Sequence, residues 1–535
     1  MFMVNGKPFF SLGGQARNSS GYNDAESERA FQAVKAVHGN TLEIPVYWEQ
    51  VEPEEGRFDF ASVDALIARA REVGIKLVLL WFATWKNGDM DYTPAWVKTN
   101  PQCFKRVVTP TGRAIWVLSS HCQANLEADK RAFVALCAHL KAVDGDERGD
   151  ERGDGRTVIA LQIENEPGIL GSDRDYGPEA QAAFDGPVSA DLVAKLQTKG
   201  AGRVFELWQA AGGKSAGTWP ELFGWAAGEL LTAWSIATYI DHIAKVGKAI
   251  HDIPMYINVW LGEGGWSIPG ETYPSGGAVS KVLDIYKWCA PHVDLIAPDI
   301  YIADSRGYEA ACATYARDDN PLFVPESAPR GSNAWLMFRA IADYGAVGYH
   351  HFAVEQVLSE DNVTIRPESR MLVDSFRCVA AIAPLLLQYR ATGKIYAVVE
   401  EENLRGQRLD LDGYVGLVEF GGRRPTDWRH AIAGTPEGEN RGRGLVIQTG
   451  RHEFYLAGAN FRLHLRPTLS PEENRDMALS REQLLTSLTQ YVSIEEGHFD
   501  DEGTFTSDRW RNGDEANHGV WVEPDVGVVR VLLCE

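Results

Sequence analysis

The chain has 535 residues, of which 44% are apolar and 24% charged, and its formal net charge is −22. This negative balance argues against nucleic acid and anionic membrane surfaces as partners, because both carry negative charge themselves. A length far above about 300 residues exceeds what one hydrophobic core usually holds, so we expect more than one domain.

The seven cysteines stand singly along the chain and form no CxxC pair. Their odd number and apolar neighbours predict buried free thiols and a reducing compartment, and no Cys/His spacing indicates a metal site. The first residues lack the basic and apolar stretches of a secretion signal, and no apolar run reaches the ~20 residues of a membrane span. We therefore expect a cytoplasmic protein without metal or cofactor, or a periplasmic one if a leader has been removed.

The first 390 residues alternate short apolar strands with amphipathic helices such as Ala61–Val73 and Leu230–Ile250. Eight such strand-plus-helix units predict an α/β fold, a (β/α)8 TIM barrel over residues 1–390. The predicted strands are Phe9–Gly13, Thr41–Pro45, Lys76–Phe82, Val158–Ile163, Met255–Val259, Leu295–Pro298, Leu322–Pro325 and Ala346–His350.

Two segments beside the fourth strand enlarge the predicted barrel. Asp144–Arg156 is a run of Asp, Glu, Arg and Gly before that strand, so we expect a solvated loop on the face opposite the strands' carboxyl ends. Residues 167–228 follow the strand and fall on the other face, where they either wall a pocket or contact a neighbouring subunit.

After Ala391, short alternating strands are separated by clusters of Gly, Asp and Asn. This pattern predicts a β-sandwich domain over residues 391–535. Its expected role is to support the barrel or to form the contact of a homo-oligomer such as a dimer, with carbohydrate binding as the alternative. The predicted strands are Lys394–Val399, Tyr414–Glu419, Gly444–Gln448, Glu453–Ala457, Arg462–Leu465 and Val528–Leu533.

Two barrel strands end on a carboxylate. The apolar, β-branched run that begins at Val158 stops at Asn165-Glu166, and Pro321-Leu-Phe-Val-Pro-Glu326 repeats the pattern. Buried charges without partners are costly, so these strand ends are expected to open onto a site. Barrel enzymes take their catalytic groups from the carboxyl ends of different strands, so Glu166 and Glu326 are predicted to converge.

Cleavage of a glycosidic bond needs one protonated carboxyl group and one ionised carboxylate, ~5–5.5 Å apart in a retaining enzyme. We predict Glu166 as the acid/base, with its pKa raised by apolar surroundings and by the charge of its partner, and Glu326 as the nucleophile. Asn165 is predicted to donate to the sugar 2-hydroxyl, and Tyr301 to hold Glu326 by a hydrogen bond. The alternative is that both glutamates are ordinary ion-pair partners.

Further candidates lie near other strand ends. Glu164 shares a strand face with Glu166 by the two-residue period, so we expect it to point inward and to pair with Arg or His. Aromatic rings there either stack on a sugar or pack in the core, and Arg17 and Asn18 either bind substrate or form a turn. One histidine of the pair 350–351 is expected to face the pocket and the other the helix layer. Trp85 either stacks on a sugar or packs in the core. Predicted substrate contacts are Arg17, Asn18, Tyr47, Trp81, Asn258, Trp260, His350 and Glu355.

The segment Gln162-Ile-Glu-Asn-Glu-Pro-Gly168 resembles the acid/base strand of glycoside hydrolase families 35 and 42, the clan A retaining β-galactosidases. Asn40-Thr-Leu-Glu-Ile-Pro-Val-Tyr-Trp48 and the following Val51–Phe60 resemble their second strand and the loop after it, and the β-rich tail is similar to one found behind bacterial relatives of family 35. The resemblance implies an exo-acting β-galactosidase with a carbohydrate substrate, Glu166 as acid/base and Glu326 as nucleophile.

The sugar is left open by the sequence. The first strand, Gly13–Ser20, and the eighth, Tyr349–Phe352, differ from the family 35 patterns, and the cysteine cluster common in family 42 is missing. The alternatives are a β-glucosidase, a β-mannosidase or a transglycosylase on the same scaffold, or a sugar-binding protein without turnover.

Overall fold

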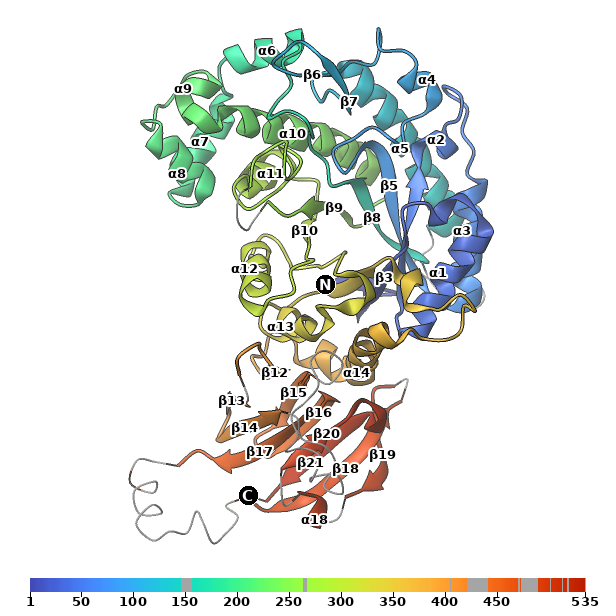
Figure 1. Cartoon of the computed structure of the whole chain (residues 1–535), viewed down its shortest axis with the longest axis vertical. Coiled ribbons are helices and arrows are strands. Elements are labelled where there is room, and N and C mark those ends of the chain that lie inside the picture. Colours follow the sequence, from blue (N-terminus) through green and yellow to red (C-terminus); the bar gives the residue numbers. More distant parts are fainter. Residues whose placement is uncertain are drawn as a thin grey trace.

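The computed structural model describes residues 1–145, 156–262, 267–404, 406–420, 441–469, 472, 489–500, 502–511, 513–516 and 519–534. A parallel sheet in the order β10-β9-β8-β5-β4-β3-β11 curls into a barrel, and a β domain lies below it (Figure 1). The barrel strands are β3 (Ser11–Gln15), β4 (Thr41–Tyr47), β5 (Lys76–Lys86), β8 (Val158–Asn165), β9 (Met255–Trp260), β10 (Leu295–Asp299) and β11 (Gly348–Phe352).

The predicted seventh strand, Leu322–Pro325, closes the ring as an extended segment between β11 and β10. On one side the Val347 N–H donates to the Leu322 carbonyl at 2.7 Å, and on the other the Ile300 N–H donates to the Glu326 carbonyl at 2.9 Å. The prolines at 321 and 325 have no N–H to donate, so the hydrogen-bond ladder is too sparse for a regular strand. The (β/α)8 prediction is confirmed, with seven regular strands and one irregular one.

Helices surround the barrel and bury apolar faces against it. Predicted helix Ala61–Val73 coincides with α3, and Leu230–Ile250 lies within α10. The helices of this layer are α1 (Asp24–Ala36), α2 (Trp48–Val51), α3 (Ala61–Val73), α4 (Ala95–Lys98), α5 (Gln123–Asp144), α10 (Ala227–Ile250), α11 (Leu283–Cys289), α12 (Ser305–Tyr315), α13 (Met337–Ala342) and α14 (Arg370–Tyr389).

An N-terminal hairpin closes the barrel at the amino ends of its strands. Its strands are β1 (Phe2–Val4) and β2 (Lys7–Phe9), paired antiparallel. The Phe2 ring is 4% exposed and lies 5.4 Å from the ring of Phe323, within the apolar cluster that fills the barrel interior. The barrel is therefore a packed core, and a site is possible only at its other end.

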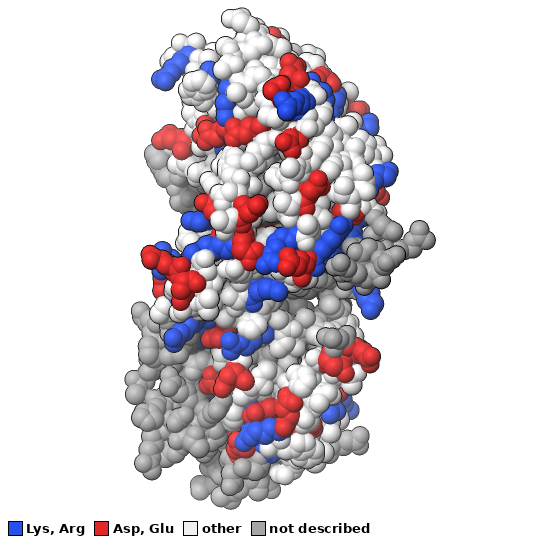
Figure 2. Space-filling view, turned by 90° about the vertical axis from the view of Figure 1, so that its right-hand side faces the viewer, with Lys and Arg blue, Asp and Glu red and all other residues white. Residues whose placement is uncertain are grey.

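Charged side chains of both signs are interspersed on the face of the molecule shown in Figure 2. Lys and Arg side chains lie beside Asp and Glu side chains on this face, both on the barrel and on the β domain. The net charge of −22 is thus not expressed there as one continuous acidic surface.

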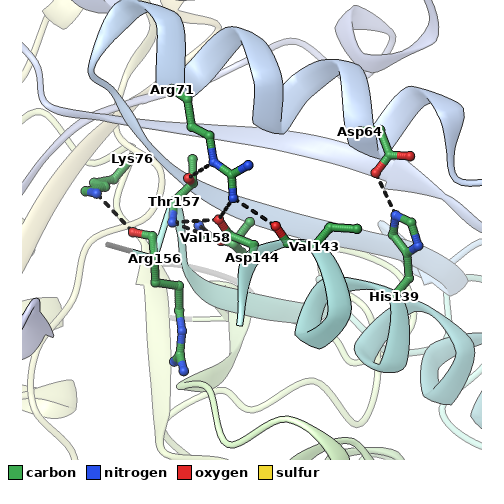
Figure 3. A network of polar contacts seen from close by, with 9 residues as sticks. All are labelled: Asp64, Arg71, Lys76, His139, Val143, Asp144, Arg156, Thr157 and Val158. Carbon is green, nitrogen blue, oxygen red and sulfur yellow. Dashed lines mark hydrogen bonds and ion pairs between the residues drawn. The ribbon is translucent and has the colours of Figure 1, made fainter. Parts of the chain in front are cut away.

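The charged run before β8 leaves and re-enters the barrel at a polar network (Figure 3). Asp144, at the end of α5, accepts hydrogen bonds from the backbone N–H groups of Thr157 and Val158 at 2.9 and 2.7 Å, and from the Arg71 guanidinium at 2.6 Å. Residues 146–155, which make up most of the run, lie outside the described residues. Its two ends are anchored at the amino end of β8, opposite the carboxyl ends of the strands.

Residues 167–226 form a helical lobe at the upper left of Figure 1. It packs against α10 and α11, and a hairpin of β6 (Arg106–Val108) and β7 (Ala114–Leu118) lies on the same side of the barrel. The lobe contains α6 (Pro178–Asp185), α7 (Ala190–Lys199), α8 (Arg203–Ala210) and α9 (Trp219–Phe223).

The C-terminal part is a sandwich of two antiparallel sheets, ordered β12-β15-β16-β21-β18-β19 and β13-β14-β17-β20, around one apolar core. All six strands expected here are found, and the predicted boundary at 390/391 falls between α14 and β12. The strands are β12 (Ile395–Val399), β13 (Gly406–Leu411), β14 (Tyr414–Phe420), β15 (Arg443–Gly450), β16 (Glu453–Ala459), β17 (Phe461–Pro467), β18 (Tyr491–Phe499), β19 (Phe505–Trp510), β20 (Val520–Val522) and β21 (Val528–Leu533); the short helix α18 (Gly513–Ala516) precedes β20.

Helix α14 joins the two domains. Among the described residues, the stretch Pro367–Tyr389 is the one helix whose length and apolar composition would suffice to cross a membrane. More than half of its most apolar 18 residues are buried, and α14 shares a core with β15 and β16 of the sandwich. The buried Arg443 of β15 donates to the Ser375 hydroxyl of α14 at 2.7 Å, which adds a polar tie between the domains.

Candidate active site

A pocket of about 560 Å³ opens at the carboxyl ends of the barrel strands. Its lining contains three acids and one lysine, and the other side chains are aromatic, aliphatic or amide. The lining residues are Asn18, Lys86, Asn87, Glu166, Trp260, Leu261, Asp299, Tyr301, Ile302, Glu326 and Phe352.

Three buried carboxyl groups meet in this pocket. One oxygen from each of Glu166, Asp299 and Glu326 lies within 4.8 Å of the other two. The spacing of the two glutamates is near the ~5–5.5 Å of retaining glycosidases and well below the ~6.5–9.5 Å of inverting ones. The structure therefore brings together the two strand-end glutamates, at a spacing that fits a retaining mechanism better than an inverting one.

Glu326 is surrounded by hydrogen-bond donors. The Gln15 side-chain amide donates to Oε1 at 2.7 Å, Asn258 donates to the same oxygen at 3.3 Å, and the Tyr301 hydroxyl donates to Oε2 at 2.5 Å. Three donors stabilise the ionised carboxylate. The arrangement fits a nucleophile, and Tyr301 makes the contact expected of it.

Glu166 is held so that it keeps a proton near neutrality. Its backbone N–H donates to Asn258 Oδ1 at 2.8 Å. Burial, followed by the charge of Glu326, raises the pKa of Glu166 to about 7, against the opposing charge of Lys86. Lys86 itself donates to Asn165 Oδ1 at 2.9 Å. Such a pKa suits a group that must both give and take a proton.

Asp299, the last residue of β10, is a third carboxyl group that sequence reasoning missed. It accepts a hydrogen bond from Asn258 at 2.8 Å and is hydrogen-bonded to the carboxyl group of Glu166. Burial raises the pKa of Asp299 well above its usual range, and the charges of Glu326 and Glu166 raise it further. Two adjacent buried carboxyl groups do not both ionise, so Asp299 keeps its proton when Glu166 ionises. Asp299 carries the same sequence signal as Glu166, a lone acid ending an apolar strand.

The end of β8 departs from regular strand geometry. Glu164 and Glu166 have φ angles of +60° and +46°, values that side-chain-bearing residues rarely adopt. The two-residue alternation therefore fails, and Glu164 lies against the helix layer, where it is hydrogen-bonded to Asp129 of α5. The prediction that Glu164 points inward and pairs with Arg or His is wrong.

The amide side chains of Asn165 and Asn258 both lie near Glu166 but have different surroundings. Asn165 is fully buried, and among the described residues no acceptor reaches its Nδ2, so its predicted bond to a sugar 2-hydroxyl stays a prediction. Asn258 bonds Glu166, Asp299 and Glu326 and does not line the pocket. Its predicted hydroxyl contact is replaced by a role in holding the three carboxyl groups. Asn18 and Trp260 line the pocket as expected.

Trp81, a predicted substrate contact, and Trp85, for which stacking and core packing were both open, pack in the core. Trp81 is buried and donates through Nε1 to Asp129 at 2.9 Å, and buried Trp85 packs edge-on against Tyr239 of α10 at 4.8 Å. Both side chains leave β5 on its helix-facing side, so neither ring reaches the pocket. Trp260 remains the candidate for stacking.

Four more predicted contacts stand outside the pocket lining. The hydroxyl of Tyr47 donates to the Asn18 carbonyl at 2.7 Å, and Glu355 accepts from the Arg17 N–H at 3.1 Å, so these residues shape the loop after β3. Arg17 itself is exposed there. His350 is fully buried and makes its contacts inside the barrel. These residues position the loop or the barrel interior and do not line the site.

The histidine pair at positions 350 and 351 divides between barrel and helix layer, but neither ring lines the pocket. His350 Nδ1 lies 2.6 Å from Glu43, and its Nε2 lies 2.8 Å from the Ser11 hydroxyl. His351 accepts from the Arg330 N–H at 3.2 Å, and burial lowers the pKa of His351 to about 3. Alternation was predicted correctly, while the depth of His350 below the pocket was not.

The other lining residues that sequence reasoning missed are polar or apolar neighbours of strand ends: Lys86, Asn87, Leu261, Ile302 and Phe352, together with Gln15 just below them. Gln15 and Lys86 are the last residues of β3 and β5, which is the signal that would have found them. None of the described lining residues comes from the helical lobe, so of the two roles predicted for residues 167–228 a pocket wall is not found.

The three carboxyl groups offer the oxygen ligands that hard cations prefer. Their surroundings fit protons better, because Gln15, Asn258 and Tyr301 already donate to Glu326, and Lys86 supplies a positive charge beside Glu166.

Two family models match the chain. Residues 20–199 match the model of glycoside hydrolase family 42, described as beta-galactosidase, and residues 372–523 match a domain of unknown function, DUF5597. The chain is 28% identical over 192 residues to a beta-galactosidase of Xanthomonas manihotis and 26% identical over 188 residues to the human beta-galactosidase-1-like protein 3. Each alignment covers 34% of this chain, and 28% and 25% of the relatives.

Solved structures resemble the chain at low identity. A beta-galactosidase from Bacillus circulans matches with a TM-score of 0.48 and 16% identity, covering 72% of this chain and 57% of that one. One from Halorubrum lacusprofundi covers 98% and 99% of the two chains, with a TM-score of 0.46 and 13% identity. The chain spans about a quarter of the length of the curated relatives it matches. Over the first half of its barrel, it is similar to the β-galactosidases of glycoside hydrolase family 42.

Proposed function

We propose that this protein is a retaining exo-β-glycosidase, specifically a β-galactosidase that removes terminal β-galactosyl residues from oligosaccharides or glycosides. The observation that supports it most is the approach of Glu166 and Glu326 within 4.8 Å at the mouth of the barrel. The match of residues 20–199 to the β-galactosidase model supports galactose as the sugar.

In the proposed first step, Glu326 attacks the anomeric carbon while Glu166 protonates the departing oxygen. The two oxygens of Glu326 are held by Tyr301 and by Gln15, so the carboxylate is oriented before substrate arrives. The product of this step is a glycosyl ester on Glu326 and a free alcohol.

In the second step, Glu166 takes a proton from water as the water attacks the glycosyl ester. Esterification removes the negative charge of Glu326, which is one of the two causes that raise the pKa of Glu166. The pKa of Glu166 therefore falls at the moment when it must act as a base. Asp299 keeps its own proton and donates a hydrogen bond to ionised Glu166, which lowers the pKa of Glu166.

Further parts of the proposal concern the setting of the enzyme. Membership in family 35 is supported by the Gln162–Gly168 motif, and a cytoplasmic location by seven cysteines that are all free thiols. A homo-oligomer, such as a dimer, is part of the same proposal. The substrate is a neutral carbohydrate, consistent with a pocket whose lining is largely amide and aromatic apart from its three acids and one lysine.

A series of 2-deoxy-2-fluoroglycosides with galacto, gluco and manno configuration tests the function. We expect the galacto reagent to inactivate fastest and mass spectrometry to find the label on the peptide that contains Glu326. Faster labelling by the gluco or manno reagent would make the protein a β-glucosidase or β-mannosidase, and predominant transfer to added sugars would make it a transglycosylase. Absence of turnover on every β-glycoside would leave a sugar-binding protein.

A further inference from the structure

A second pair of carboxyl groups lies directly behind the candidate active site, between β8 and the helix layer. Glu164, two residues before Glu166, and Asp129 of α5 are both fully buried, and neither lines the pocket. The proposed reaction uses neither group. A buried acid pair without a catalytic duty calls for a physical explanation, because burial of charge is costly.

Asp129 has the surroundings of an ionised carboxylate. Its Oδ1 accepts from the Trp81 indole N–H at 2.9 Å, and its Oδ2 accepts from the Thr84 hydroxyl at 2.6 Å and from the Tyr239 hydroxyl at 3.3 Å. These donors come from β5 and α10, so they fix Asp129 from two sides. Hydrogen bonds to the charged form of a carboxylate stabilise that form.

Glu164 has the surroundings of a neutral carboxylic acid. Its Oε2 accepts from the Trp85 N–H at 2.7 Å, whereas among the described residues no donor reaches its Oε1. Glu164 and Asp129 are hydrogen-bonded to each other, which requires a proton between two groups that otherwise only accept. Burial, and then the charge of Asp129, raise the pKa of Glu164 well above its usual range.

The remaining titratable group that faces this pair is Tyr239 of α10, whose pKa burial raises well above its usual range. The groups of β5 that contact the two acids are Trp81, Thr84 and the Trp85 backbone, none of which carries a charge. Among the described residues, no Lys, Arg or His forms a hydrogen bond or ion pair with either acid. Burial raises the pKa of Asp129 too, but its four hydrogen-bond partners lower it, whereas the charge of Asp129 raises the pKa of Glu164 further. The negative charge is therefore assigned to Asp129 and the proton to Glu164.

This proton lies next to an unusual backbone. The positive φ angles of Glu164 and Glu166 turn the chain so that the first side chain enters the helix layer and the second enters the pocket. Strained conformations of this kind persist only where the surroundings hold them. Glu164 is held through Asp129 and Trp85, and Glu166 through the bond of its N–H to Asn258.

We propose that Glu164 is a positioning residue, kept as a neutral acid whose hydroxyl donates to Asp129, and that this hydrogen bond fixes the turn that aims Glu166 at the glycosidic oxygen. The inference rests on the proposed function only in naming Glu166 as the acid. It predicts that the requirement at position 164 is for a hydrogen-bond donor of this size and not for a charge.

The test compares Glu164→Gln with Glu164→Ala on aryl β-galactosides. The Gln amide donates to Asp129 and its oxygen accepts from Trp85, so Glu164→Gln is expected to keep kcat/KM within a few fold of wild type. In Glu164→Ala, a misaimed acid slows poor leaving groups, which need protonation, far more than activated ones. We expect the ratio of kcat/KM for phenyl over dinitrophenyl galactoside to fall about 10²-fold.

The ratio is measured on one preparation, so a partly unfolded variant does not change it. Glu127→Ala is the matched control, because Glu127 is exposed on the same helix two residues before Asp129 and should leave the ratio unchanged. The proposal is overturned if Glu164→Gln loses as much as Glu164→Ala, or if Glu164→Ala slows both substrates equally.

An infrared difference spectrum separates the inference from the proposed function. At a pH above 8, where Glu166 is ionised, wild type minus Glu164→Gln should retain the carbonyl stretch of a protonated carboxylic acid. Absence of this band would overturn the inference even in an active enzyme. Presence of the band in a protein that cleaves no glycoside would reject the proposed function and leave the protonated pair standing.

Discussion

At the candidate active site, the proposed reaction depends on the pKa of Glu166. Burial and this charge raise the pKa of Glu166 to about 7, and protonated Glu166 is the form that the first step needs. For a substrate with a poor leaving group, kcat/KM is therefore expected to fall as pH rises through about 7. A pH–rate profile checks this, and a profile that stays flat from pH 6 to about 9 would contradict the assignment of the acid.

The nucleophile has its own signature. Glu326→Ala should lower kcat by at least about 10⁴-fold, because no covalent intermediate forms, while external azide should restore turnover of activated galactosides. The vacated space admits the small anion on the face that the carboxylate occupied, so the product is an α-galactosyl azide. Product analysis by NMR checks the anomeric configuration, and a rate close to wild type without azide would remove Glu326 from this role.

At the scale of the strand, the buried acid at position 164 makes stability depend on pH. The folded protein keeps this proton because the pKa of Glu164 is raised well above 4.5, whereas the unfolded chain releases it above about pH 4.5. Wild type should therefore lose stability relative to Glu164→Gln as pH rises from 4.5, by up to about 1.4 kcal/mol per pH unit. Urea unfolding of both proteins at pH 5 to about 8 measures the difference, and a constant difference would mean that Glu164 is ionised.

The charged run before β8 should be dispensable. Its ends are tied through Asp144, Thr157 and Arg71 at the amino end of the strand, far from the pocket (Figure 3). Deletion of residues 146–155, closed with a short Gly-Ser link, is expected to change kcat/KM by less than about twofold, since loop length affects closure entropy only weakly. Steady-state kinetics checks this, and a large loss would place the run near the substrate.

Strands were predictable where short apolar runs end in Gly, Pro or polar residues, and the predicted ranges overlap every barrel strand, although the first was placed two residues early. This pattern did not show that prolines would leave Leu322–Pro325 irregular, because the missing N–H groups matter only once its neighbours are known. The period of two failed at Glu164, where hydrogen bonds to Asp129 and Trp85 override the backbone preference.

The two catalytic candidates were predictable from the strand ends alone. Of the partners of Glu326, Tyr301 was predictable in the same way. Gln15 and Asn258 were not, because they reach Glu326 from strands distant in the chain. The sequence did not decide whether Trp81 and Trp85 contact the sugar or the core, because a ring at a strand end suits either side of the sheet. Only their register places them among the helices.

At the scale of the molecule, contacts between α14 and β15 connect the barrel to the sandwich. The guanidinium of Arg443 is buried and donates to the Ser375 hydroxyl and to the Arg441 carbonyl at 2.8 Å. Arg443→Met should lower the free energy of unfolding by about 1–3 kcal/mol, since buried acceptors lose their donor. Urea unfolding checks this, with Arg408→Met on an exposed side chain as control; an equal effect of both would contradict it.

The hairpin β1–β2 has a consequence for the order of events in turnover. Phe2 closes the barrel at the amino ends of its strands, so substrate and products enter and leave at the carboxyl ends. In the proposed reaction, the departing alcohol and the incoming water therefore pass through the same opening. An alcohol that stays bound there competes with water for the glycosyl group on Glu326. A high concentration of an alcohol acceptor should therefore shift the products from hydrolysis to transglycosylation.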